Sequence, residues 1–393
     1  MTMLTDLRPA PGAHVRQRSS TPWRHLDLLT VAVVLLIAAF GVTMVWTATR
    51  IPLEAAGLSG FAYAKKQAVF SLIGLAVMLA VAAVDYRRYR DWAAVVYGGM
   101  LFLLVAVFVV GHRNFGAEAW FQLGSLQFEP SEAAKIALIV ALAAYASSFK
   151  GSLDGRALLG LIALAAVPFV LVYKQPDLGS ALVLLAILAT VVVVAGARSR
   201  HLAALGLIAA VVLVAVVQFG LLRGYQESRI SSFLHTPAQV SPALLQTKAG
   251  ANIYNVVESK TAISHGGLLG QGIGHGTSTN LSSVPEQYAD FIFSAVGEQV
   301  GLIGSALLLA LFLVLLWRTW QAALLSRDDF GRLLCAGVFG YLLFQTFENV
   351  GMTMGIMPVA GIPLPWVSYG GSAVLAEFAA VGLVLNVRMR RFG

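Results

Sequence analysis

Long apolar runs separated by short polar segments make up most of the chain. A membrane-spanning helix needs about 20 mostly apolar residues, and ten runs approach that length. They lie near 28–48, 67–84, 92–111, 133–148, 157–173, 178–196, 201–222, 291–316, 333–353 and 364–387. The alternating segments of about ten residues that are typical of transmembrane strands are absent. The pattern therefore predicts an all-α polytopic membrane protein with ten transmembrane helices.

Composition supports this fold class and excludes others. Only 12% of the 393 residues are charged and 58% are hydrophobic, whereas about 25% of residues are charged in soluble domains. The net charge of +8 comes from Lys and Arg residues between apolar runs, so it does not indicate a nucleic-acid-binding function. The single cysteine, Cys335, lies in an apolar run and excludes an intrachain disulfide.

The basic residues predict the orientation. With the N-terminus in the cytoplasm, 17 Lys and Arg residues lie inside, nine lie outside and Lys135 lies within a span. Four of the nine belong to the long segment 223–290, and the positive-inside rule applies to short loops, so the ratio becomes 17 to 5. Both termini are therefore expected in the cytoplasm, and the protein in the cytoplasmic membrane.

One membrane domain is expected over 25–393, after a disordered cytoplasmic tail at 1–24. The large segment 223–290 between the seventh and eighth helices is expected outside the cell. Its second half carries six glycines between 266 and 276. Glycine permits close approach of the backbone to a ligand, but a flexible loop has the same composition.

Charged residues occur inside four of the expected spans: Lys135, Glu298, Glu348 and Glu377. A charge in lipid costs at least about 2.5–3.5 kcal/mol, so these side chains are expected to face the interior of the bundle. Glu132 lies three residues before Lys135, on the same helix face and within its reach. The two residues either neutralise each other or shape a polar cavity.

Two aspartates stand at the starts of expected spans. Asp290 precedes Phe291, Ile292 and Phe293, where partial desolvation would make it a better proton acceptor. Asp177, in KQPDLGS, has a similar position. For both residues an N-terminal helix cap is the alternative function.

Six stretches in this order are together similar to the SEDS family (shape, elongation, division, sporulation). They are WFQLGSLQFEPSEAAK at 120–135, KQPDLGS at 174–180, GYQESRISSFL at 224–234, SHGGLLGQGIGHGT at 264–277, PEQYADFIF at 285–293 and NVGMTMGIMPVAGIPLPWVSYGGSA at 349–373. The last stretch resembles the RodA (elongation) branch more than the FtsW (division) branch.

The resemblance implies a peptidoglycan glycosyltransferase that polymerises lipid II outside the membrane together with a class B penicillin-binding protein. It implies that Asp290 is the catalytic carboxylate. The family often has Arg–Gln where this chain has Lys66–Gln67, and Gln-Ser-Lys where it has Glu258-Ser259-Lys260. The expected substrate-binding residues are Lys66, Glu132, Lys135, Asp177, Arg229, Ser259, Lys260 and Ser368.

The reaction implied by the resemblance needs a base for the acceptor hydroxyl and cations near the pyrophosphate leaving group. A divalent cation, Mg²⁺ or Mn²⁺, is a candidate cofactor, but the sequence has no closed carboxylate cage. Two alternatives remain open. Isolated charges within spans also suit a transporter or a flippase for lipid-linked precursors, and a scaffold that only activates a penicillin-binding protein is the third reading.

Overall fold

The computed structural model describes residues 22–110, 112–114, 117–123, 126–149, 151, 153–203, 206–207 and 248–391. Nine of the ten expected spans have a helix in these residues: α1 (Leu28–Ala55), α2 (Ala62–Ala83), α4 (Ala93–Val110), α5 (Pro130–Ala146), α6 (Gly155–Lys174), α7 (Leu178–Val194), α13 (Ile292–Leu324), α14 (Asp329–Thr353) and α15 (Gly371–Met389). Seven of these nine, all except α5 and α7, are long and apolar enough to cross a membrane. The chain is a multi-pass helical membrane protein. The expected span at 201–222 lies largely outside the described residues, so the count of ten stays a prediction.

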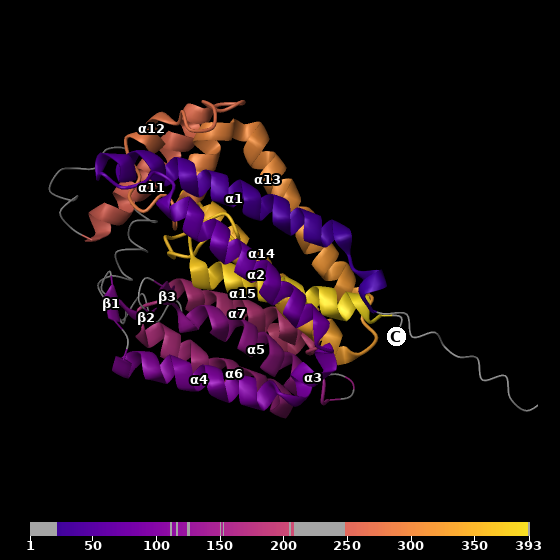
Figure 1. Cartoon of the computed structure of the whole chain (residues 1–393). Coiled ribbons are helices and arrows are strands. Elements are labelled where there is room, and N and C mark those ends of the chain that lie inside the picture. Colours follow the sequence, from indigo (N-terminus) through magenta and orange to yellow (C-terminus); the bar gives the residue numbers. More distant parts are fainter. Residues whose placement is uncertain are drawn as a thin grey trace, which may run out of the picture.

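The helices run side by side between two ends of the molecule (Figure 1). One end, called the loop end below, carries the strands β1 (His112–Asn114), β2 (Ala117–Leu123) and β3 (Leu126–Phe128) and the helices α11 (Lys248–Gly266) and α12 (Thr277–Asn280). The strands form an antiparallel sheet in the order β1-β2-β3. The opposite end, the tail end, carries α3 (Tyr86–Asp91) and the C-terminal end of α15. α14 and α15 are mostly buried inside the bundle, whereas α2 and α4 are largely exposed.

The segment before α15 corrects one expected boundary. The span expected from 364 begins only at Gly371, because 363–370 holds two prolines and a left-handed residue, Trp366 (φ 57°). Proline removes a backbone donor and ends regular helices. The non-helical segment is nevertheless buried, with Leu364 and Trp366 at most 1% exposed. Irregular backbone within a membrane protein is tolerated where protein surrounds it.

α13 is longer than expected because it consists of two segments. Its 33 residues would span about 50 Å as one straight helix, far more than the hydrocarbon core. The helix breaks at Gly301, where φ is 64°. The N–H groups of Leu302 and Ile303 donate instead to the carbonyls of Gly267 and Leu268, at 2.9 and 3.1 Å. The glycine-rich loop therefore satisfies the backbone groups that the break releases.

The segment 223–290 contains helices that the sequence reading did not predict. α11 packs along α13, and the short α12 follows the glycine-rich turns. Glu298 holds α12 in place, because its buried carboxylate accepts the N–H groups of Ser278 and Thr279 at 2.6 and 2.9 Å and the Thr279 hydroxyl at 2.7 Å. Residues 223–247 lie outside the described residues.

At the tail end, Asp27 joins three helices. Its carboxylate accepts a hydrogen bond from Arg318 Nε of α13 at 3.0 Å and lies 3.3 Å from Arg388 Nη1 of α15. Burial raises the pKa of Asp27, but the hydrogen bonds from Arg318 and Thr30 and the charge of Arg388 lower it further, so that the net pKa is below its ordinary value. These contacts fasten α1, α13 and α15 together.

The orientation is open to a direct test with single cysteines. Leu281, 73% exposed, lies at the loop end, and Arg327 is exposed at the tail end, between α13 and α14. In a Cys335→Ala background we expect Leu281→Cys to react with an impermeant maleimide in intact cells. Arg327→Cys is expected to react only after permeabilisation, because the 17-to-5 asymmetry places it in the cytoplasm. The opposite labelling pattern would contradict the predicted topology.

Candidate functional site

A chain of polar side chains crosses the interior of the bundle. Lys135 Nζ of α5, which is fully buried, lies 2.7 Å from Glu132 Oε1 and donates to Gln345 Oε1 of α14 at 3.2 Å. Gln345 Nε2 donates to Glu377 Oε1 of α15 at 3.2 Å, and the Trp366 N–H donates to Glu377 Oε2 at 2.7 Å. The structure thus confirms the contact between Glu132 and Lys135, and all four charged residues expected inside spans are at most 1% exposed.

The carboxyl groups of Glu129, Glu132 and Asp177 lie near one another beside the start of α5 and are called the carboxyl cluster below. Glu132 Oε2 and Asp177 Oδ2 are buried without a hydrogen-bond partner. Glu129, which precedes α5, lies near both carboxylates. Loss of water around Glu129 and the charges of Asp177 and Glu132 raise the pKa of Glu129 to about 8. Asp177 Oδ1 accepts the Ser180 N–H at 3.0 Å, so Asp177 also caps α7, as the sequence suggested.

Asp290 lies at the loop end and is partly exposed. It is not the cap of α13, because the helix begins at Ile292 with Phe291 as its cap residue. Asn349 Nδ2 of α14 donates to the Asp290 carbonyl at 2.8 Å and to the Ile362 carbonyl at 2.8 Å. The main chain of Asp290 is therefore attached to a buried helix, and the capping alternative loses its geometric basis.

α14 contacts both the polar side chains around Lys135 and the backbone of Asp290. Gln345 and Asn349 are four residues apart and share one helix face. Gln345 Nε2 donates to the carbonyl of Pro363 at 3.1 Å, and Asn349 holds the adjacent carbonyl, that of Ile362. The segment before α15 thus links Lys135 to the backbone of Asp290. The sequence reading did not single out Gln345 or Asn349, although two amide side chains in an apolar span are a recognisable signal.

Three tyrosines, one of them two residues before Asp290, pack against one another. The rings of Tyr63, Tyr288 and Tyr369 lie 4.8 to 5.9 Å apart, between their centroids. The N–H of Tyr369 donates to the Tyr288 carbonyl at 2.9 Å, which fixes the loop before α13 against the segment before α15. Burial and the neighbouring Glu286 carboxylate raise the pKa of Tyr288. The three rings thus join the start of α2 to the loop before α13 and to the segment before α15.

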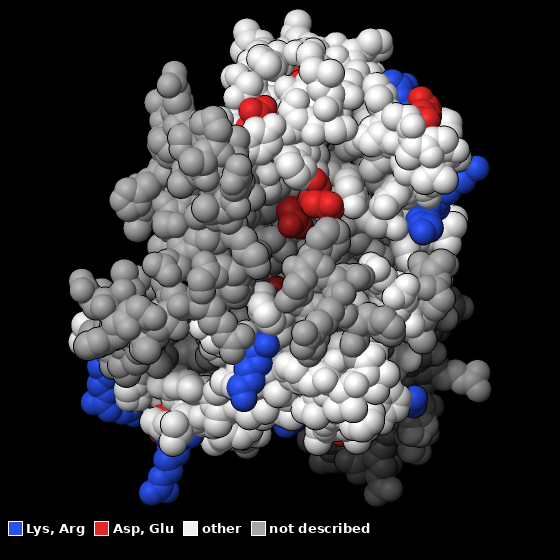
Figure 2. Space-filling model, turned by 90° about the vertical axis from the view of Figure 1, so that its left-hand side faces the viewer, with Lys and Arg blue, Asp and Glu red and all other residues white. Residues whose placement is uncertain are grey.

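Seen from the loop end, acidic side chains lie in a hollow near the centre of the molecular surface, and most of the visible Lys and Arg side chains lie towards its edges (Figure 2). Among the predicted binding residues, Lys66 and Lys260 are exposed. Ser259 and Ser368 are buried, and their hydroxyl groups bond to the backbone of Thr353 and Leu364. These bonds attach α11 to the end of α14 and fix the turn before α15, and substrate binding by the two serines stays a prediction. Arg229 lies outside the described residues.

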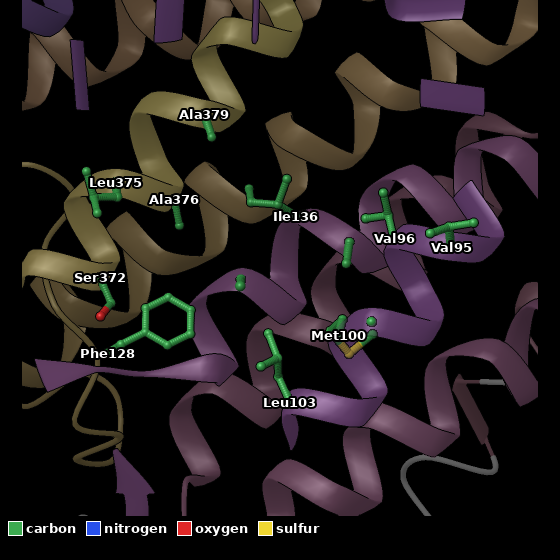
Figure 3. Close-up of a pocket in the computed structure, with 13 residues that line it drawn as sticks. Val95, Val96, Met100, Leu103, Phe128, Ile136, Ser372, Leu375, Ala376 and Ala379 are labelled. Carbon is green, nitrogen blue, oxygen red and sulfur yellow. The ribbon is translucent and has the colours of Figure 1, made fainter. Parts of the chain in front are cut away.

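An apolar groove of about 410 Å³ lies between α4, α5 and α15 (Figure 3). It extends from Phe128 and Ser372 at the loop end to Val95 and Val96 near the start of α4. Ser372 is the one polar residue in its lining. Ser372 Oγ also accepts the Glu129 N–H at 2.9 Å, so one end of the groove adjoins the carboxyl cluster.

No group of three or more His, Cys, Asp and Glu side chains suited to a metal ion occurs in the part of the chain that the structure describes. Within the described ranges the side chains thus offer no closed cage for a cation. A cation that arrives with a phosphate-containing ligand needs fewer protein ligands, as is usual for Mg²⁺.

The fold and site define a polytopic helical membrane protein with a partly exposed carboxylate at one end and an apolar groove between its helices. The chain belongs to the FtsW/RodA/SpoVE (SEDS) family, because the model of this family, described as "Cell cycle protein", matches residues 27–392. The resemblance that the motifs indicated is confirmed, and with it the prediction of an enzyme of the peptidoglycan glycosyltransferase class.

Relatives from both branches are similar to this chain. The probable peptidoglycan glycosyltransferase FtsW of Geobacter sulfurreducens is 34% identical over 371 residues, which cover 93% of this chain and 96% of the relative. The peptidoglycan glycosyltransferase MrdB of Escherichia coli is 32% identical over 373 residues, covering 93% and 94%. The identities do not separate the two branches.

Two solved structures share the fold. One is a chain of a peptidoglycan synthase complex, with a TM-score of 0.74 and 33% identity over 93% of this chain and 98% of the other. The second is the rod shape determining protein RodA of Thermus thermophilus, with a TM-score of 0.68 and 31% identity over 94% and 99%.

Proposed function

We propose that this chain polymerises lipid II at the outer face of the cytoplasmic membrane, with Asp290 as the general base. In each step, Asp290 removes the proton from the 4-hydroxyl of the acceptor GlcNAc. The oxygen bonds to the anomeric carbon of the donor MurNAc, and undecaprenyl pyrophosphate leaves with the electrons of the broken bond. The observation that carries this proposal is the placement of Asp290, partly exposed at the loop end and fixed through its main chain to α14.

The charges around the site suit a pyrophosphate leaving group. Lys66 and Lys260 are exposed at the loop end and are free to approach phosphate oxygens. Lys135 has a different function, because it is buried and paired with Glu132. We assign Lys135 and Glu132 to maintaining the polar interior next to Asp177. Mg²⁺ or Mn²⁺ would bind together with the pyrophosphate of the substrate and neutralise part of its charge.

The groove between α4, α5 and α15 fits the hydrocarbon chain of the substrate. Its lining is apolar apart from Ser372, and it ends beside the carboxyl cluster at the loop end. A ligand with a long apolar tail and a charged head needs an apolar surface that leads to a polar one. The tail would occupy the groove while the pyrophosphate and sugars lie at the loop end.

The sequence GIPLPWVSYGG at 361–371 favours an elongation (RodA-type) function, with an FtsW-type division function as the alternative. The similarity to a chain of a peptidoglycan synthase complex supports a class B penicillin-binding protein as the partner, which would cross-link the strands.

The competing function is transport of a lipid-linked precursor. It is favoured by Glu348, whose two carboxylate oxygens are buried without a partner, as in proton-coupled transporters. An assay of purified protein in detergent, mixed with lipid II alone, distinguishes a glycosyltransferase from a flippase or a scaffold. A glycosyltransferase produces glycan strands that resolve on a gel, whereas a flippase or a scaffold leaves lipid II unchanged.

Two neighbouring glycines of α4 allow a matched test of the groove. A Cβ added at Gly98 or Gly99 meets no atom within 4 Å, so both positions accept a larger side chain, but only Gly99 lines the groove. We expect Gly99→Phe to fill the groove and raise the KM for lipid II about tenfold, through lost tail binding. Gly98→Phe, the control, is expected to resemble the parent. Equal KM values for the two variants would show that the tail binds elsewhere.

A further inference from the structure

The carboxylate of Glu298, which is fully buried in α13, bonds to a segment 20 positions earlier in the chain. It accepts the N–H groups of Ser278 and Thr279 at 2.6 and 2.9 Å and the Thr279 hydroxyl at 2.7 Å. Hydrogen bonds to a carboxylate are shorter and roughly twice as strong as those between neutral groups. The three bonds therefore close a loop of the chain that begins at α12, passes through Asp290 and returns to α13.

The glycine-rich turns before α12 pack against the same part of α13. The Gln271 N–H donates to the Glu298 carbonyl at 2.9 Å, and the Gly274 N–H donates to Gln299 Oε1 at 2.8 Å. A Cβ on Gly276 would lie 2.8 Å from Glu298 Oε2, so a larger residue there would push the carboxylate away. At Gly276 the close approach that glycine permits thus serves the contact with Glu298.

Residues 281–289, which separate α12 from Asp290, form a compact connection. The Asp290 N–H donates to the Glu286 carbonyl at 3.2 Å. Val284 is buried in one apolar cluster with Phe291, the residue that follows Asp290. A displacement of α12 would therefore be transmitted to the main chain of Asp290.

We propose that Glu298 is a positioning residue, whose carboxylate holds α12 and thereby sets the place of Asp290 opposite the acceptor hydroxyl. This inference rests on the proposed role of Asp290 as the general base. Asn349 attaches the Asp290 carbonyl to α14 at 2.8 Å, and Glu298 supplies a second attachment, through α12, to α13. A base must lie within hydrogen-bond reach of the proton that it removes, and a misplacement of about 1 Å can lower the rate about 10²-fold.

Glu298→Gln tests the proposal. Glutamine keeps the size of the side chain, but its amide turns an N–H group towards backbone donors that need an acceptor. We expect kcat for lipid II polymerisation to fall about tenfold or more while KM stays near the value of the parent. The reason is that Glu298 is fully buried and does not contact the substrate.

Glu348→Gln is the matched control. Glu348 is also fully buried, in α14, but neither of its carboxylate oxygens has a hydrogen-bond partner among the described residues. The same substitution therefore breaks no hydrogen bond, and kcat and KM are expected to equal those of the parent.

Thr279 offers a milder pair of variants if Glu298→Gln does not fold. Thr279→Val removes the hydroxyl that donates to Glu298 and keeps the shape of the side chain, whereas Thr279→Ser keeps the hydroxyl. We expect Thr279→Val to lower kcat, by less than Glu298→Gln does, and Thr279→Ser to retain the kcat of the parent. Equal kcat values for the two variants would contradict the proposal.

Hydrogen exchange, measured by mass spectrometry, follows α12 without any need for enzymatic activity. In Glu298→Gln we expect faster exchange in the peptide 277–283, where two N–H groups lose their acceptor, and unchanged exchange in the peptide 333–349 of α14. The proposal is overturned by unchanged exchange in 277–283, by equally faster exchange in both peptides, or by a kcat equal to that of the parent. It is also overturned if only KM changes.

The exchange measurement separates this proposal from the proposed function. A parent that forms no glycan strands would contradict the polymerase function. Faster exchange in 277–283 alone would still show that Glu298 holds α12, and unchanged exchange would overturn that contact as well.

Discussion

Replacement of Asp290 by asparagine is expected to lower the rate of lipid II polymerisation by about 10²-fold or more, the usual contribution of a general base. Asparagine keeps the size of the side chain and leaves the backbone bond from Asn349 to the Asp290 carbonyl intact, so the fold is expected to be preserved. Binding of lipid II is also expected to survive, because the base acts mainly in the transition state. Polymerisation rates and lipid II binding of the purified variant measure these two effects separately.

Glu286 is the matched control for this prediction. It lies four residues before Asp290, is exposed, and has its carboxylate next to Tyr288. Glu286→Gln is expected to retain most of the activity. If Asp290→Asn polymerised lipid II within a few-fold of the parent while Glu286→Gln did not, the base would be Glu286.

The second large effect is expected at the pair of Glu132 and Lys135. Both residues are at most 3% exposed, and the distance from Lys135 Nζ to Glu132 Oε1 is 2.7 Å. Removal of one partner leaves a buried charge uncompensated, which costs about 3–5 kcal/mol of stability. Lys135→Met leaves Glu132 without its cation in the interior, and Glu132→Gln leaves Lys135 without a carboxylate partner, beside the amide of Gln345 and the ring of Tyr341.

A double-mutant cycle measures this interaction. Thermal unfolding of the parent, Glu132→Gln, Lys135→Met and the double variant gives the coupling between the two side chains. We expect the double variant to be more stable than the sum of the single losses predicts, because it contains neither charge. Strictly additive losses would mean that the two side chains stabilise the protein independently.

The course of the helices was predictable from the sequence because lipid imposes a length and a composition on each span. The same argument placed Glu298, Glu348 and Glu377 in the interior correctly, since a charge facing lipid is too costly. Hydropathy averages over about 20 residues, however, and cannot detect a break at one residue such as Gly301. Hydropathy also did not reveal α11, because the mean hydropathy of this helix is too low for it to stand out as a span.

The candidate site was predictable only in part. The pair of Glu132 and Lys135 followed from spacing, since helix geometry relates residues three or four apart. The capping position of Asp177 followed from its place just before an expected span. The bond from Asn349 to the Asp290 carbonyl joins residues 59 positions apart, and only the fold brings them together. The same is true of Glu129, whose partner Ser372 is 243 positions away. For Ser259 and Ser368 the fold adds what a motif cannot show, namely that both hydroxyl groups are buried and bond to the backbone, and their role in substrate binding stays a prediction.

The most direct test of the central claim counts the leaving group. Each glycosidic bond formed between two lipid II molecules must release one undecaprenyl pyrophosphate, and transport releases none. Purified protein is mixed with lipid II without any partner, and mass spectrometry measures released lipid pyrophosphate alongside the length of the glycan strands. We expect release in proportion to the bonds formed by the parent, and almost none from Asp290→Asn. Unchanged lipid II with the well-folded parent, or equal release by both proteins, would contradict the account.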